Sequence, residues 1–325
     1  MMPVKLAAAL FAALVPICAV AHEHGEQWTL VNEYPATSLP GEGDEFFAKQ
    51  VADLTEGRIS VVTMPDARMG YKSSEQLAAV EQGKVAMADT LGPAMGNAEP
   101  LFLLSSLPFA ASGIAGARAL YDAARPAYEA AFARHRQKLL YASPWPPSGL
   151  WTRGPADTLP AIAALRIRTY DTTSAYLFSR LGAHPLMVSY ADLGPKLASG
   201  EVNAVLSSGD GGAARSFWDH LPRFTQLDYA IPLSFTTVNL DRWGSLDEKE
   251  RASLLEAARR TEAKVWKAVE ARVEENYARM RSHGVTIDTQ VSPALAARLR
   301  AEAALALRQW ADAAGPEARE ILERR

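Results

Sequence analysis

One uninterrupted helical segment limits the folds open to this chain. Residues 246–282 contain neither proline nor glycine, and at 1.5 Å per residue a helix of that length would span roughly 55 Å. A helix that long extends beyond one small domain, so it is expected to bridge two. The alternative is a coiled coil between subunits, but the apolar positions Val265, Trp266 and Val269 keep no clean heptad repeat.

Strands and helices alternate along the rest of the chain. Strands are predicted at residues 28–34, 58–64, 85–89, 139–142, 165–170, 202–206 and 235–240. Helices are predicted between them at 43–56, 73–83, 114–137, 172–181 and 192–199, with a last amphipathic helix at 293–310. This order is typical of parallel α/β sheets. The pattern breaks at Pro144-Trp145-Pro146-Pro147 and restarts, which indicates two α/β domains.

The first residues have the pattern of a secretion signal. Lys5 precedes an apolar run, and Ala19-Val20-Ala21 forms a small-x-small cleavage site, so residues 1–21 are expected to be removed. The alternative, an uncleaved anchor, needs roughly 20 apolar residues, more than this run contains. Because Cys18 lies in the signal, the mature chain has no thiol, which excludes disulfides, thiolate metal sites and cysteine nucleophiles.

Composition narrows the function classes. Removing Lys5 leaves 33 of the 34 basic residues against 37 acidic ones, a net charge of about −4, which argues against nucleic acid and anionic lipid as partners. There is no Walker loop, no HExxH and no G-x-S-x-G motif, and the histidines lack the spacing of a ligand set. Neither a metal nor a cofactor is expected.

An ordered set of short motifs occupies residues 165–205. The set comprises Leu165-Arg166-Ile167-Arg168, Gly182-Ala183-His184-Pro185, Tyr190, Leu197-Ala198-Ser199-Gly200 and Val202-Asn203-Ala204. In order and spacing it resembles the DctP-like solute-binding subunits of TRAP transporters, the tripartite ATP-independent periplasmic transporters. Leu107-Pro108-Phe109 upstream and Val238-Asn239 downstream extend the resemblance over nearly the whole chain after the signal.

The resemblance implies an α/β, two-domain periplasmic binding protein of the Venus-flytrap type, with crossing hinge strands and a long bridging helix. Domain I is expected to comprise residues 22–145 plus 233–272, and domain II residues 146–232 plus 273–325. It further implies a periplasmic monomer that binds a small organic acid and delivers it to TRAP membrane subunits, with no chemistry of its own.

Arg168 is the expected anchor of the ligand. In the family, the second basic residue of the first motif grips the ligand carboxylate, and a guanidinium suits this role because its planar fork matches a carboxylate. The alternative for Arg168 is a structural ion pair. Arg166 lies on the same strand face and is interpreted as a solvated or loop-paired charge. The resemblance also places the aromatic ring of Tyr190 against the ligand.

The sequence departs from the sialic-acid-type members at two places. The sialic-acid-type members carry a second arginine of the ligand cleft at the position of Ser148. They also carry a Glu-Asn pair at the position of Leu206-Ser207. Fewer fixed donors predict a ligand with fewer polar groups, a monocarboxylate with an apolar or aromatic body. Ser207 or Ser208 is expected to meet a single oxo or hydroxyl group.

Aromatic and loop residues complete the predicted site. Trp145, Trp151 and Tyr170 flank Arg168 in sequence and are candidate ring walls, although core filling is the alternative for each. Tyr34 ends the first strand, and Met69 and Gly92 follow later strands, so all three are candidates on geometry.

Other functions remain open on the sequence alone. The ligand could be a C4-dicarboxylate or a sugar acid if Arg215 or Lys72 supplies a second cation. A ligand-sensing input protein shares this fold and differs only in its partner. The remote alternative is a periplasmic lyase or hydrolase in which Arg168 anchors the substrate and Asp171 or Asp210 acts as base.

Overall fold

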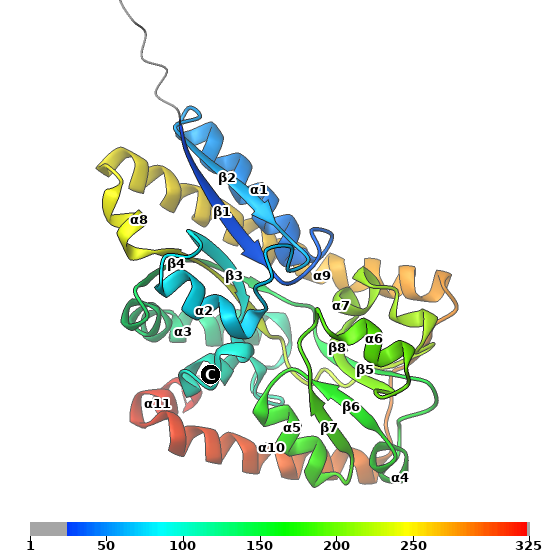
Figure 1. Cartoon of the computed structure of the whole chain (residues 1–325). Coiled ribbons are helices and arrows are strands. Elements are labelled where there is room, and N and C mark those ends of the chain that lie inside the picture. The colour runs from blue at the N-terminus through cyan, green and yellow to red at the C-terminus, as the bar shows by residue number, and fades with distance from the viewer. Residues whose placement is uncertain (1–24, 324–325) are drawn as a thin grey trace, which may run out of the picture.

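The computed structural model describes residues 25–323, which fold around two β-sheets (Figure 1). The first sheet has the strand order β2-β1-β3-β10-β4 and the second the order β11-β9-β5-β8-β6-β7. We call the first sheet with helices α1 to α3 the first unit, and the second sheet with helices α4 to α7 the second unit. This confirms the predicted α/β fold with two units.

The first sheet is mixed. Its strands are β1 (Glu26–Asn32), β2 (Ile59–Met64), β3 (Met87–Leu91), β4 (Gln137–Pro144) and β10 (Leu233–Asn239). β1 pairs in parallel with β2 and β3, whereas β10 runs antiparallel to β3 and β4. The accompanying helices are α1 (Leu39–Leu54), α2 (Ser73–Glu81), α3 (Gly113–Arg134) and α8 (Leu240–Ser245), and two 3₁₀ segments, η1 (Gly92–Met95) and η2 (Pro100–Ser106), follow β3.

The second sheet has the same α/β character. Its strands are β5 (Ser148–Thr152), β6 (Arg166–Thr169), β7 (His184–Met187), β8 (Ala204–Ser208), β9 (Arg223–Thr225) and β11 (Thr286–Asp288). Its helices are α4 (Leu159–Ala163), α5 (Thr172–Arg180), α6 (Leu193–Ala198), α7 (Gly209–Ala214) and the short η3 (Phe217–Asp219). β6 pairs in parallel with β7 and β8.

Two chain segments cross between the units side by side. Residues 145–147 join β4 to β5, and residues 226–232 join β9 to β10. The Trp145 amide donates to the Pro232 carbonyl at 2.9 Å, and the Tyr229 amide donates to the Ser148 carbonyl at 2.9 Å. Because each segment satisfies the backbone groups of the other, the predicted pair of crossing strands is present as a hydrogen-bonded ribbon.

The long helix α9 (Glu248–Ser282) passes along both units (Figure 1). It begins two residues later than predicted, because the Asp247 side chain accepts the Glu250 amide and caps the first turn. Val265 packs in a core of the first unit, whereas Met280 packs in a core of the second. The prediction of a bridging helix is therefore confirmed.

The C-terminal helices α10 (Pro293–Ala314) and α11 (Pro316–Glu323) also contact both units. Leu295 and Leu299 of α10 pack in the core beside β6, whereas Trp310 and Ile321 pack in the core beside α3. The division into residues 22–145 plus 233–272 and 146–232 plus 273–325 stays a prediction, and these contacts favour a C-terminal segment shared by both units.

The expected signal, residues 1–21, lies outside the described residues. Across residues 25–323 no helix is both long enough and apolar enough to span a bilayer.

Candidate functional site

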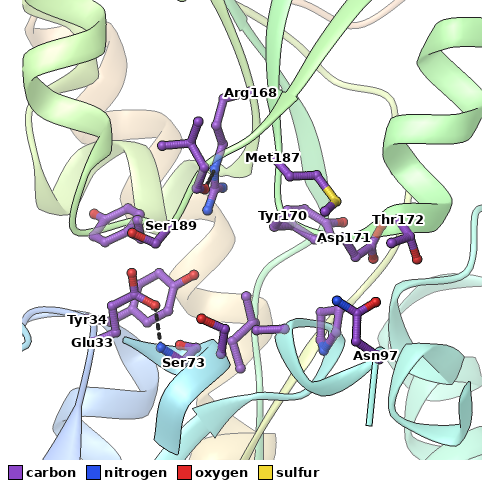
Figure 2. A pocket seen from close by; sticks show the side chains of 17 residues that line it. Glu33, Tyr34, Ser73, Asn97, Arg168, Tyr170, Asp171, Thr172, Met187 and Ser189 are labelled. Carbon is purple, nitrogen blue, oxygen red and sulfur yellow. Dashed lines mark hydrogen bonds between the residues drawn. The ribbon is translucent and has the colours of Figure 1, made fainter. Parts of the chain in front are cut away.

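A cavity of about 200 Å³ lies between the two units (Figure 2). The first unit contributes the end of β1, the start of α2 and the segment after β3, and the second contributes the end of β6, the start of α5 and the loop after β7. Its lining residues include Glu33, Tyr34, Ser73, Asn97, Arg168, Tyr170, Asp171, Met187 and Tyr190. A smaller hollow of about 20 Å³ shares Tyr34, Arg168 and Tyr170 with it and adds Trp145, Ser148, Ser207 and Ser208.

Arg168 reaches the cavity from the carboxyl end of β6. Its side chain is almost fully buried, with 3% of the residue exposed. Nε donates to the Val188 carbonyl at 2.8 Å, and Nη1 lies 3.5 Å from the Leu206 carbonyl. Among residues 25–323, no carboxylate oxygen lies within ion-pair distance of this guanidinium. Backbone carbonyls hold the side chain, and the charge of Asp171 acts on it only from beyond ion-pair distance, so the described residues do not form the structural ion pair given as the alternative.

Arg166 occupies a different environment. It is exposed, and its guanidinium donates to the carbonyls of Gly200 and Glu201 at 2.7 and 3.1 Å. The interpretation as a loop-paired charge is confirmed. The two arginines share a strand face, but only Arg168 lies at the strand end beside the first unit.

Three aromatic rings meet beside Arg168. The Tyr34 ring centroid lies 4.4 Å from that of Tyr190 and 4.6 Å from that of Trp145, so the contact joins both units and the crossing ribbon. Burial raises the pKa of Tyr34 well above its ordinary value, while the charge of Arg168 opposes the shift. The Tyr34 hydroxyl therefore stays protonated and can donate a hydrogen bond at physiological pH.

The hydroxyl groups of several other predicted site residues already make hydrogen bonds within the protein. The Tyr190 hydroxyl donates to the Gly211 carbonyl at 2.6 Å, so its ring rather than its hydroxyl faces the cavity. The Ser208 hydroxyl accepts the Gly211 amide at 3.1 Å and caps α7. The Tyr170 hydroxyl donates to the Ser148 hydroxyl oxygen at 3.5 Å. Ser148 belongs to β5, a strand that the sequence patterns did not predict.

Three predicted residues line neither hollow. Trp151 is fully buried between Phe217 and Phe224, because β5 turns this side chain into the core of the second unit. Met69 is exposed on its loop. Gly92 has no room for a side chain, since a Cβ there would lie 2.6 Å from the Phe235 ring.

Leu206, which stands where the sialic-acid-type members carry the first residue of the Glu-Asn pair, lines neither hollow. Leu206 is fully buried in the core that contains Ile167 and Phe178. Its neighbour Ser207 points to the opposite face of β8 and reaches the smaller hollow, because successive side chains of a strand alternate.

Sequence reasoning missed several lining residues, among them Glu33, Ser73 and Asn97. Glu33 precedes Tyr34, and Ser73 opens α2, but neither pattern by itself signals a ligand. Asp171 also lines the cavity, whereas the sequence suggests it only as a catalytic base of the lyase or hydrolase alternative. Both of its oxygens are engaged, by the Ser174 amide at 2.6 Å and by the Ser106 hydroxyl at 2.5 Å.

Asp210, the other candidate base, lies outside the cavity. Its carboxylate accepts the Leu39 amide at 2.8 Å and the Asn276 side-chain amide at 3.0 Å. Leu39 begins α1 in the first unit, so Asp210 ties the two units together.

The two candidates for a second cation do not line the cavity either. Lys72 pairs with Asp192 at 2.7 Å. Arg215 lies over the Tyr190 ring at 4.4 Å and donates to the Tyr190 carbonyl at 2.9 Å. Of the described residues, Arg168 alone lines the cavity with a lysine or arginine side chain.

Comparison with solved structures places this arrangement among known receptors. Two Bordetella pertussis proteins, DctP7 and DctP6, are extracytoplasmic solute receptors that bind pyroglutamic acid. The chain is 27% identical to DctP7 with a TM-score of 0.89, and 25% identical to DctP6 with a TM-score of 0.88. Each comparison covers 92% of this chain and 99% of the other.

A TRAP periplasmic solute-binding protein of Chromohalobacter salexigens, solved with D-glucuronate bound, shares the fold alone. It is 19% identical with a TM-score of 0.82, over 91% of this chain and 98% of that one. The family model described as bacterial extracellular solute-binding protein, family 7, matches residues 30–312. Since that match covers most of the sequence, the chain belongs to family 7 of the bacterial extracellular solute-binding proteins, the DctP-like solute-binding subunits of TRAP transporters.

Proposed function

We propose that this protein captures a small monocarboxylate in the cavity between its units, with Arg168 as the carboxylate clamp. The observation that carries the proposal is Arg168, a residue that is 3% exposed, lines a cavity and has no carboxylate within ion-pair distance among the described residues. A buried, uncompensated charge is costly. A bound carboxylate offsets that cost and forms two parallel charge-assisted hydrogen bonds.

The size and charge of the cavity support a compact ligand with one carboxylate. Its volume of about 200 Å³ is below the roughly 300–1,000 Å³ of pockets for drug-sized molecules. A second carboxylate would find no cation among the described lining residues, and burying it unpaired costs several kcal/mol. The rings of Tyr34, Tyr170 and Tyr190 suit an apolar or planar body.

The Bordetella receptors indicate which monocarboxylate to test first. Both bind pyroglutamic acid, a five-membered ring with one carboxylate. A ligand of that shape matches the single cation and the aromatic walls. In the proposed site, Ser148 and Ser207 lie beside the clamp as hydrogen-bonding groups.

The proposed role extends to partners and location. The protein acts in the periplasm as a monomeric receptor without catalysis and passes its ligand to the TRAP membrane subunits. Against the lyase or hydrolase alternative, both oxygens of Asp171 are engaged and Asp210 lies outside the cavity. The crossing ribbon is a hinge about which the units open and close.

The test is a matched ligand screen. Mass spectrometry of the denatured protein identifies any copurified acid, and calorimetry then compares pyroglutamate, a benzoate-type acid, a branched 2-oxo acid, succinate and a sugar acid. We expect one of the monocarboxylates to bind most tightly. Tighter binding of succinate or of the sugar acid than of every monocarboxylate contradicts the proposed ligand class and supports the dicarboxylate or sugar-acid alternative.

A further inference from the structure

We infer that Glu33 and Ser73 form a second recognition point that reads the N–H and C=O groups of a lactam ring. The inference rests on the proposed function, in which Arg168 holds the carboxylate of a small ring acid. The amide edge of that ring would contact Glu33 and Ser73 on the opposite wall of the same cavity. Figure 2 shows Glu33 and Ser73 side by side on the first unit, across the cavity from Arg168.

Glu33 is a carboxylate fixed in place at the boundary of the two units. Its side chain lines the cavity, and 2% of the residue is exposed. One oxygen accepts the Ser73 amide at 2.9 Å, and the other accepts the Ala191 amide of the second unit at 2.8 Å. Each oxygen of an ionised carboxylate has about two acceptor sites. An acceptor position therefore remains beside the cavity, and it suits a ligand N–H.

Ser73 supplies the complementary donor. It is the first residue of the nine-residue helix α2, and 2% of it is exposed. Within residues 25–323, its buried hydroxyl has no hydrogen-bond partner, yet the residue lines the cavity. A buried hydroxyl without a partner costs free energy, and a carbonyl oxygen of the ligand removes that cost.

Glu33 and Ser73 together favour a ligand that carries a hydrogen-bond donor next to a hydrogen-bond acceptor. In a small lactam the amide is cis, so its N–H and C=O project from the same edge of the ring. A ring acid that lacks both groups leaves the Ser73 hydroxyl without a hydrogen-bond partner and places apolar carbon atoms against the Glu33 carboxylate. A lactam adds no charge beside Glu33 and Asp171, the two carboxylates that line the cavity together with Arg168.

A pair of ligands and a pair of variants test the inference. Pyroglutamate carries the lactam edge, whereas cyclopentanecarboxylate has the same ring size and the same carboxylate but no amide. We expect the wild type to bind pyroglutamate at least about tenfold more tightly, by isothermal titration calorimetry. Ser73→Ala should weaken the binding of pyroglutamate by about tenfold and leave the affinity for cyclopentanecarboxylate unchanged.

Ser179→Ala is the matched control, because this serine is exposed on α5 and lines neither hollow. It should change neither affinity. Equal wild-type affinity for the two acids, or an equal loss of both in Ser73→Ala, overturns the lactam assignment while leaving the Arg168 clamp in place. Failure of both acids and of every other monocarboxylate to bind the wild type overturns the proposed function as well.

Discussion

The ammonium of Lys72 lies 2.7 Å from the carboxylate of Asp192, and this ion pair joins the start of α2 to the start of α6. The Glu33 carboxylate makes a parallel connection to the Ala191 amide. Both contacts link the first unit to the second beside the cavity, and both must break when the units separate. In the hinge motion proposed above, this structure is the closed arrangement.

The Lys72–Asp192 pair is expected to have a small effect on ligand affinity. Both side chains are substantially exposed, at 37% and 48%, and water and salt screen such pairs. Asp192→Asn should weaken ligand binding by no more than about threefold, and added salt should reduce that difference further. Calorimetry at low and high ionic strength measures the effect, with Asp53→Asn, which breaks a pair within α1, as control.

The pH dependence of this pair has a definite sign. The hydrogen bond from Lys72 lowers the pKa of Asp192. The ion pair is therefore formed above the ordinary pKa of an aspartate and is lost as the pH falls through the lowered value. A loss in affinity much larger than threefold at neutral pH contradicts the assignment of a weak, exposed contact.

Replacing Arg168 should remove binding without harming the fold. Loss of a charge-assisted bidentate pair costs at least about 3 kcal/mol, more than about a hundredfold in affinity. Arg168→Ala should abolish micromolar binding, and Arg168→Lys should restore only part of it because an ammonium lacks the planar fork. Arg166→Ala, which alters the exposed neighbour, is the control.

The melting temperature of unliganded Arg168→Ala should equal or exceed that of the wild type. The substitution removes a buried charge that has no carboxylate partner among the described residues. Unchanged calorimetric affinity in this variant contradicts the clamp, whereas a large drop in melting temperature contradicts the view that Arg168 serves the ligand rather than the fold.

Two buried carboxyl groups in the first unit should make folding stability depend on pH. Burial and the charge of Asp89 raise the pKa of Asp44 well above its ordinary value, and burial raises the pKa of Asp89 to about 6. The Asn32 amide and the Tyr141 hydroxyl donate to Asp44, and the Thr236 hydroxyl donates to Asp89. The pair is therefore expected to hold at least one proton at neutral pH.

The raised pKa values set the sign of the effect. The stabilising contribution of the two carboxyl groups to the free energy of unfolding is fully present below pH about 4, the ordinary pKa of an aspartate. It is lost as the pH rises through about 6. Asp89→Asn imitates the protonated acid and should remove on the order of 2 kcal/mol of this pH dependence. Urea denaturation at pH 4.5 and pH 8 measures it, with Asp53→Asn as surface control. An unchanged difference between the two pH values contradicts the prediction.

Ligand binding should make the protein more compact. The Leu39 amide donates to the Asp210 carboxylate and the Ser106 hydroxyl donates to the Asp171 carboxylate, and both bonds close across the units. A bound acid favours this arrangement, because Arg168 and the first unit contact the ligand together only when the units are closed. Small-angle scattering should show a smaller radius of gyration with ligand. Sustained conversion of a bound acid by the purified protein contradicts a receptor without catalysis.

The local patterns of the sequence determined the elements that carry the site. Alternating strand and helix patterns predicted the two sheets, and the absence of proline and glycine from residues 246–282 predicted α9. The strand and helix predictions depend on short-range geometry, which the order of residues fixes. Arg168 was predicted differently, from the resemblance of its motif to the family, and the structure places it near the carboxyl end of a parallel strand, where side chains of an α/β sheet face the crevice.

Tertiary structure alone decided which neighbours share the cavity. Trp151 and Leu206 lie close to the clamp in sequence, but strand alternation turns both into the core, whereas Glu33 and Ser73 reach the cavity only because the first unit closes on the second. Tertiary contacts also decided which charges are paired. Lys72 pairs with Asp192, and Arg215 lies 3.6 Å from Asp66 of the opposite unit. Arg168 donates to backbone carbonyls and lies over the Tyr170 ring, with no carboxylate of the described residues within ion-pair distance. Which charge remains free for a ligand depends on distances between segments far apart in the chain, and those distances exist only once the two units have packed together.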